Sequence, residues 1–210
     1  MSHKRTVGIF IFDAVEVLDF CGPFEVFATA SAPTGEPSED GEQDSARLFD
    51  VRVIAEERKI VSARGGLRVE PHHGIDDCPP LDVLLVPGGY GTRPLMFNPR
   101  VLDWIAAQNE RVETMTSVCT GAFLLGKAGI LDGLTATTHW ESISQMRSLF
   151  PEVSVLDDVR VVDEGRIVTS AGVSAGIDMA LHLVDRWHGR EIAEATARDM
   201  EYRWDERARS

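Results

Sequence analysis

Short runs of β-branched and aliphatic residues alternate along most of the chain with segments that carry apolar residues at helical spacing. The runs predict strands at residues 7–12, 49–55, 81–86, 114–118, 153–156, 159–162 and 167–169. Helical patterns lie between them, and one begins where Asn98 is a suitable N-cap and Pro99 a suitable first helical residue. This alternation is typical of βα units around a parallel sheet.

A proline predicts where the first helix begins. Pro23 fits the first turn of a helix over the apolar residues that follow it, which places Asp19 in the loop after the first strand. The remaining pattern predicts a hairpin at residues 60–70 and helices at residues 122–128, 173–184 and 191–202.

Length and charge narrow the class of protein. The chain has 210 residues, which suggests one domain, and 43% of them are hydrophobic. A formal net charge of −13 without a basic patch argues against nucleic acid as a partner. No apolar run could span a bilayer, and no signal peptide precedes the first strand, so we expect a cytoplasmic protein without a membrane partner.

One segment, residues 31–47, differs in composition from the rest. It is rich in Pro, Gly and Ser and carries five acidic residues against a single Arg. Such a segment cannot bury enough apolar surface to fold alone. We expect an acidic, flexible loop between the first helix and the second strand.

The chain has three cysteines, Cys21, Cys78 and Cys119, without a CxxC spacing. An odd number at these positions indicates neither a disulfide framework nor a zinc knuckle. The flanking proline and glycine residues predict a loop around His72-His73, and this pair with nearby aspartates also fits no recognised ligand spacing, so we expect no metal.

The most informative stretch is Ser117-Val118-Cys119-Thr120-Gly121, between a predicted strand and an apolar helix. This is the context of a nucleophile elbow, with cysteine in place of serine. The turn would expose the thiol above the sheet, and the helix N-terminus behind it would stabilise a thiolate. The alternative is that Cys119 is one more buried small hydrophobe.

A second glycine-rich turn, Pro87-Gly88-Gly89, also follows a core strand. The carboxyl ends of neighbouring parallel strands lie at one edge of a sheet, so the two turns can be adjacent. The N–H groups of Gly89 and Thr120 would then point at a charge that develops on a substrate. Asp19 is either a helix cap or a functional acid whose pKa burial would raise.

Five motifs together resemble a known family. They are Val-Leu-Asp-Phe-Cys-Gly-Pro at 17–23, Val-Pro-Gly-Gly-Tyr-Gly at 86–91, Ser-Val-Cys-Thr-Gly-Ala-Phe-Leu-Leu at 117–125, Ala-Thr-Thr-His-Trp at 136–140 and Ala-Gly-Val-Ser-Ala-Gly-Ile-Asp at 171–178. In this order they resemble the ThiJ/PfpI superfamily, most closely its isocyanide (isonitrile) hydratase branch, from about residue 7 to residue 202.

The resemblance implies a single ThiJ/PfpI-like (class I glutamine amidotransferase-like) domain over residues 1–210. Its expected fold is α/β and flavodoxin-like, a doubly wound, mostly parallel sheet with helices on both faces. It further implies a homodimer, no cofactor, Cys119 as nucleophile, and Asp19 where several relatives have glutamate. Two departures are Cys21, where the hydratases usually have Thr, and the longer acidic loop.

The expected reaction is the hydration of an organic isocyanide, a small molecule, to an N-substituted formamide. Cys119 would add to the isocyanide carbon to give a thioimidate, Asp19 would move the protons, and Thr120 would complete the catalytic set. We expect Gly88, Gly89, Phe20 and Cys21 to bind substrate in an apolar pocket built from Leu18, Phe20 and their neighbours. Behind these residues, Asp178 is expected to orient Thr120 or a water, and His139 to anchor a turn or transfer a proton.

Other functions fit parts of the same signature. One is glyoxalase-like chemistry on an α-oxoaldehyde, and another is a non-enzymatic redox sensor in which Cys119 is oxidised. Protease activity is disfavoured because Thr120 stands where the protease-like relatives have histidine. The signature also occurs in the amino-terminal domain of AraC-type transcription regulators, but after the predicted core this sequence has room for only one more helix.

Overall fold

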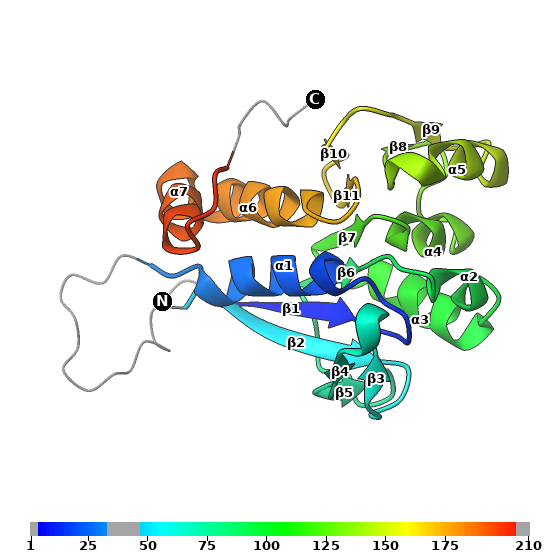
Figure 1. Ribbon diagram of the computed structural model, residues 1–210, viewed down its shortest axis with the longest axis horizontal. Helices are drawn as coiled ribbons and strands as arrows, with labels where there is room; N and C mark the ends of the chain where they lie inside the picture. The colour runs from blue at the N-terminus through cyan, green and yellow to red at the C-terminus, as the bar shows by residue number, and fades with distance from the viewer. Residues whose placement is uncertain (1–3, 33–46, 205–210) are drawn as a thin grey trace.

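A mostly parallel sheet of seven strands forms the centre of the computed structural model, which describes residues 4–32 and 47–204 (Figure 1). In spatial order the strands are β10 (Val161–Asp163), β11 (Ile167–Ser170), β7 (Thr114–Val118), β6 (Val83–Val86), β1 (Arg5–Phe10), β2 (Phe49–Ala55) and β5 (His73–Gly74). Only β10 runs antiparallel to its neighbour. The predicted α/β class is therefore confirmed.

The strand order reverses direction at β1, which pairs with β2 on one side and with β6 on the other. In doubly wound sheets, ligands bind beside such a switch point, outside the carboxyl ends of the strands. Every residue of β6 and β7 is buried, as expected for parallel strands covered on both faces. The segments that follow β1, β6 and β7 carry Asp19, Gly88 and Cys119 to this edge.

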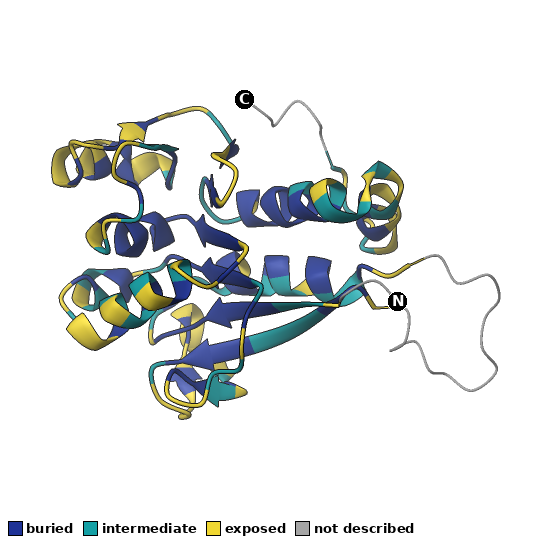
Figure 2. Cartoon of the chain, turned by 180° about the vertical axis from the view of Figure 1, so that it is seen from behind, coloured by how far each residue is buried: buried dark blue, intermediate teal, exposed yellow. Residues whose placement is uncertain are grey.

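Helices cover both faces of the sheet. On one face α1 (Val17–Thr29), α6 (Ala175–His188) and α7 (Arg190–Asp199) pack against one another, and on the other α3 (Pro99–Asn109) packs on α4 (Gly121–Lys127) (Figure 1). Figure 2 shows α4 and the central strands buried, whereas α3 is exposed on its outer side.

The smaller elements lie around this core. They are β3 (Val61–Ser62), η2 (Arg64–Gly66), β4 (Arg68–Val69), α2 (Thr92–Leu95), β8 (Thr135–Ala136), η3 (Trp140–Ser142), α5 (Ile143–Leu149) and β9 (Ser154–Val155). Strands β3 and β4 form the predicted hairpin around the Arg-Gly-Gly turn. In the described ranges no helix combines the length and apolar character that crossing a bilayer requires.

The structure corrects the expected start of the first helix. Helix α1 begins at Val17, so Asp19 lies in its first turn rather than in a loop, and Pro23 lies inside the helix. Proline has no N–H, so residue 23 cannot donate the helical hydrogen bond to the carbonyl of Asp19. Pro23 was a poor marker of the helix start, because the helical turn that precedes it forms without a proline at its first position.

Two other local predictions are also wrong. Val173 precedes α6 with a left-handed φ of 57°, although its spacing matched that helix. The histidine segment was expected to be a loop, yet His73–Gly74 forms the edge strand β5, because β2 supplies its hydrogen bonds. Most of the predicted acidic loop, residues 33–46, lies outside the described residues.

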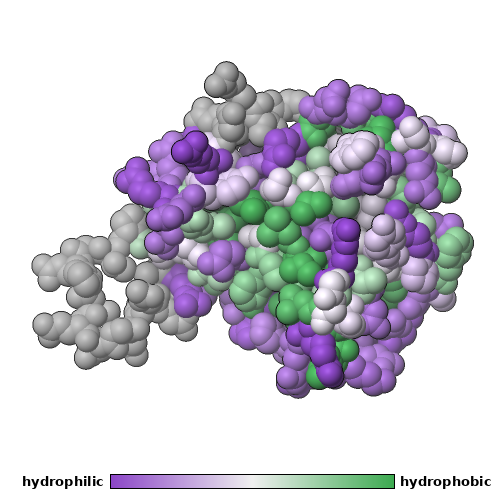
Figure 3. Space-filling view, viewed as in Figure 1, coloured by the Kyte–Doolittle hydropathy of each residue, from purple (hydrophilic) through white to green (hydrophobic). Residues whose placement is uncertain are grey.

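Helix α1 presents a row of apolar side chains to solvent. Leu18 is exposed, and Val17, Cys21 and Phe24 are half-buried along the same side. In Figure 3 apolar side chains gather in the middle of the face on which α1 lies, with polar side chains around them. The homodimer implied by the resemblance stays a prediction.

The packing of α4 on β6 yields a test of stability. A Cβ on Gly121 would overlap the backbone carbonyl of Val86, which cannot rotate away. We expect Gly121→Ala to lower the free energy of unfolding by about 2 to 4 kcal/mol, measured by chemical denaturation. The control Gly133→Ala has a φ of 76° but no heavy atom near its Cβ, and should cost only about 1 kcal/mol. Equal losses would contradict the steric explanation.

Candidate active site

Cys119 occupies a strained turn between β7 and α4. Its φ of 56° lies in the left-handed region, which residues with a Cβ seldom adopt. The Cys119 amide donates to the carbonyls of Ser170 (3.1 Å) and Ala171 (3.3 Å), and the Thr138 hydroxyl donates to the Cys119 carbonyl (2.8 Å). These contacts hold the turn, so the strand–turn–helix geometry predicted for this stretch is confirmed.

The turn after β6 lies directly against the turn after β7. A Cβ on Gly88 would be 2.6 Å from the Thr120 nitrogen and 2.8 Å from the Cys119 Cβ, so only glycine permits this approach. Gly89 has a φ of 127° and pairs with Val15 in an isolated bridge. The two glycine-rich turns are therefore adjacent, as the sequence predicted.

Asp19 lies behind this junction and is completely buried. Its Oδ2 accepts a hydrogen bond of 3.0 Å from the Gly88 amide. Its Oδ1 is also buried and makes no hydrogen bond of ordinary length within the described residues, although the Cys119 thiol and the Val173 amide act on the carboxylate. A buried carboxylate oxygen so weakly bonded is costly and available to exchange a proton.

Burial changes the pKa of this carboxyl group. The pKa of Asp19 is raised from 3.8 to about 7, mainly by loss of hydration and in smaller part by the charge of Glu16, although the hydrogen bond from the Gly88 amide opposes the shift. The Cys119 thiol and the Val173 amide also favour the ionised form. The predicted direction is confirmed, and Asp19 titrates near neutral pH.

The thiol of Cys119 is protonated in the resting protein. Burial raises the pKa of Cys119 to about 12, the negative charge of Asp19 adds to the shift, and the Thr120 amide opposes it. The start of α4 was expected to stabilise a thiolate, but desolvation and the neighbouring carboxylate outweigh its effect on the pKa of Cys119. Cys119 and Asp19 titrate as a coupled pair that holds one proton above about pH 7.

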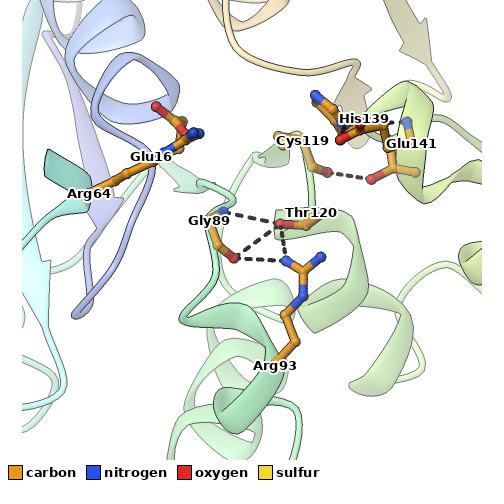
Figure 4. A network of polar contacts seen from close by, with 9 residues as sticks. Glu16, Arg64, Gly89, Arg93, Cys119, Thr120, His139 and Glu141 are labelled. Carbon is orange, nitrogen blue, oxygen red and sulfur yellow. Dashed lines mark hydrogen bonds and ion pairs between the residues drawn. The ribbon is translucent and has the colours of Figure 1, made fainter.

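A cavity of about 150 Å³ opens over Cys119. Its lining residues are Glu16, Arg64, Gly89, Tyr90, Arg93, Cys119, Thr120, His139, Glu141, Ser142 and Val173. Figure 4 shows charged side chains from several elements around the cysteine. The lining is polar, which corrects the expectation of an apolar pocket.

Thr120 is the centre of a polar network on one side of this cavity (Figure 4). Its Oγ1 accepts from the Gly89 amide (3.1 Å) and from Arg93 Nη1 (3.5 Å), and it lies 3.3 Å from the Thr92 hydroxyl. Because Gly88 and Gly89 already donate to Asp19 and Thr120, neither amide is free to stabilise a substrate charge in this state. The Thr120 amide, which interacts with the sulfur, remains in place for that role.

Several predicted site residues lie elsewhere. Phe20 is buried in the core, Cys21 is half-buried on α1, and neither lines the cavity. Asp178 accepts hydrogen bonds from Arg160 Nε (2.5 Å) and from the Tyr202 hydroxyl (2.9 Å). It therefore does not orient Thr120, as one of the predictions had it. His139 does line the cavity, and its Nδ1 accepts from the Glu141 amide (3.3 Å).

Sequence reasoning missed the charged lining of the cavity. Arg64 comes from the β3–β4 hairpin and pairs with Glu16 at 2.5 Å, a contact between residues too far apart in sequence for a local pattern to reveal. For Arg93 the sequence offers a weak indication of a place near the site, because this residue comes four positions after Gly89 of the second glycine-rich turn. Its Nη1 donates to the Gly89 carbonyl at 3.1 Å.

Other candidate sites lack comparable chemistry. A larger cavity of about 260 Å³ beside β1 and β2 contains no cysteine, serine or histidine in its lining. Residues 4–32 and 47–204 include no group of three metal-ligating side chains, and the His72 Nδ1 accepts from the Val53 amide (2.9 Å). The cavity over Cys119 is therefore the candidate active site.

The structure combines a flavodoxin-like sheet with a cysteine at the turn between β7 and α4. Similarity to known proteins identifies the family to which this combination belongs. Residues 5–186 match the DJ-1/PfpI family, and the chain belongs to this family. The ThiJ/PfpI resemblance is thereby confirmed.

Individual relatives differ in function. Isonitrile hydratase of Pseudomonas putida is 36% identical over 93% of this chain and 78% of its own length. The HTH-type transcriptional regulator GbdR of Pseudomonas aeruginosa is 35% identical over 82% of this chain, which covers 46% of the regulator. The crystal structure of a ThiJ/PfpI family protein from Pseudomonas syringae superposes with a TM-score of 0.82, at 28% identity over 97% of this chain and 77% of that one.

The raised pKa of Asp19 predicts a gain in stability when the charge is removed. The carboxyl titrates near 3.8 unfolded and near 7 folded, so the penalty for burying its charge is absent at low pH and complete above about pH 7. We expect Asp19→Asn to raise the free energy of unfolding at pH 8 by about 1 to 3 kcal/mol, and to have little effect near pH 4.

Asp178→Asn is the matched control. Asp178 is also buried but accepts hydrogen bonds from Arg160 and Tyr202, so its loss should destabilise the protein by about 1 to 3 kcal/mol at pH 8. Urea denaturation at the two pH values measures both variants. A destabilised Asp19→Asn at pH 8 would contradict the assigned cost of burying this charge.

Proposed function

We propose that this protein is an isocyanide hydratase, which adds water to an organic isocyanide to give an N-substituted formamide. The observation that carries the proposal is the pair formed by the Cys119 thiol and a buried Asp19 with a pKa of about 7, at the base of the cavity. The similarity to an isonitrile hydratase over 93% of the chain also supports it. A small cavity suits a small substrate.

The first half of the reaction forms a covalent bond to sulfur. Ionised Asp19 accepts the thiol proton as the Cys119 sulfur attacks the terminal isocyanide carbon, and protonated Asp19 then delivers that proton to the same carbon. The product is a thioimidate, in which carbon is bonded to sulfur and hydrogen and doubly bonded to nitrogen. Oδ1 of Asp19, which makes no hydrogen bond of ordinary length among the described residues, suits this transfer.

The second half returns the enzyme to its starting state. Water attacks the thioimidate carbon while Asp19 accepts one of its protons and passes it to the nitrogen. The tetrahedral adduct then expels the Cys119 sulfur, and the hydroxyl proton returns to the thiol. The net reaction adds one water to the isocyanide. In the formamide, the carbon carries the oxygen and one hydrogen, and the nitrogen carries the other hydrogen. The Thr120 amide stabilises the sulfur as it leaves.

A second candidate is glyoxalase-like chemistry, which the polar lining of the cavity favours. An α-oxoaldehyde would present carbonyl oxygens to groups such as Arg93 and His139, and the thiol would form a hemithioacetal. Lactate formation from methylglyoxal, measured beside isocyanide turnover, separates the two reactions.

Turnover of a small alkyl isocyanide is the direct test. Formamide should accumulate above the buffer rate, as measured by liquid chromatography and mass spectrometry. Cys119→Ala should reduce kcat/KM by at least about 1000-fold, and Asp19→Asn by about 100-fold or more, because each removes one partner of the proton transfer. Cys78→Ala is the control, since this half-buried thiol does not line the cavity and should leave the rate unchanged. No product over buffer would overturn the proposal.

The pKa values also fix the pH dependence. Below about pH 7 Asp19 carries a proton and cannot accept one from the thiol, so kcat/KM should rise with pH through about 7. The upper limit, set by the Cys119 pKa of about 12, lies beyond the usual range. The residual activity of Asp19→Asn should lack the step near 7. A flat profile for the wild type through this region would contradict the role of Asp19.

A further inference from the structure

Two arginines line the cavity of the candidate active site, and Arg93 is the one that forms no ion pair within the described residues. It extends from α2 into the cavity, and its Nη1 donates to three neutral oxygens, the Gly89 carbonyl and the Thr92 and Thr120 hydroxyls (Figure 4). The guanidinium carbon also lies 5.5 Å from the Tyr90 ring centre. No carboxylate within the described ranges forms an ion pair with Arg93.

The other charges of the lining have partners or lie in solvent. Arg64 pairs with Glu16 at 2.5 Å. Glu141 is two-thirds exposed and lies 3.9 Å from the His139 ring nitrogen. The lining therefore contains one arginine, Arg93, that forms no ion pair with a carboxylate in the described part of the chain.

The remaining donors of Arg93 suit an anion. Only Nη1 of Arg93 donates to an acceptor in the described residues, so within these ranges the Nε and Nη2 hydrogens are available to a ligand. A guanidinium binds a carboxylate through two parallel N–H···O bonds, and it does so more strongly where water is excluded. The bonds from Nη1 to Thr120 and Gly89 fix the orientation of this group relative to the Cys119 turn.

We propose that the substrate carries a carboxylate, which Arg93 binds while the isocyano carbon faces the Cys119 sulfur. This inference rests on the proposed function and specifies its substrate class as short isocyano carboxylates, whose hydration gives N-formyl amino acids. The carboxylate forms no covalent bond and changes no step of the hydration. A cavity of about 150 Å³ requires that only a few bonds separate the carboxylate from the isocyano group.

The test compares isocyanoacetate with its methyl ester, which differs by the charge that Arg93 would bind. We expect the wild type to favour the acid in kcat/KM by about 10- to 100-fold, the range of a hydrogen bond to a charged group. Arg93→Gln should reduce this ratio to near one, and Arg93→Lys should restore part of it. Any displacement of Thr120 slows both substrates, so the ratio isolates recognition of the charge.

Arg111→Gln is the matched control, because Arg111 is exposed near the start of β7, at the opposite edge of the sheet. It should leave the ratio at the wild-type value. A wild-type ratio near one, or a ratio that Arg93→Gln leaves unchanged, would overturn the inference while the hydratase function stands.

If neither isocyanide is hydrated, the proposed function fails. The binding of a carboxylate ligand then tests whether Arg93 forms an anion site. Isothermal titration calorimetry with N-formylglycine and its methyl ester, on the wild type and on Arg93→Gln, measures the same discrimination without turnover. Preference for the acid that Arg93→Gln abolishes would support an anion site. Equal or absent binding of acid and ester would overturn it.

Discussion

The hydrogen bond from the Gly88 amide to Asp19 Oδ2, 3.0 Å long, is the contact on which the candidate site depends. It joins the first turn of α1 to the end of β6, and Gly88 in turn touches the Cys119 turn after β7. Three segments far apart in sequence thus meet at one point. Burial at this junction raises the pKa of both the Asp19 carboxyl and the Cys119 thiol. One proton can therefore be exchanged between the two groups.

The site also depends on backbone conformations that the rest of the fold holds in place. Cys119 and Val173, which both line the cavity, have left-handed φ angles of 56° and 57°. Such conformations cost free energy and persist only where surrounding contacts fix them. For Cys119 these contacts come from the β11 end and from Thr138, so the position of the thiol depends on neighbouring strands.

The buried strands were the most predictable part of the fold. Strands β2 and β7 have the ends predicted for them, because each is rich in the β-branched and apolar residues that favour strands, and turn or polar residues flank it. The start of α1 was less predictable, since Pro23 is tolerated inside the helix. Edge strand β5 has only two residues, and its hydrogen bonds come from β2, so its own sequence carries no signal.

By itself the sequence determined the α/β class and the family, and it singled out Cys119 and Asp19, because motifs and apolar periodicity are local properties. Only the tertiary structure decided the ionisation of these groups, since desolvation depends on what packs around them. It also decided that the cavity is polar, and that Gly88 and Gly89 donate inward. Arg64 and Arg93 reach the cavity from separate elements, and which charges meet there depends on how the chain folds.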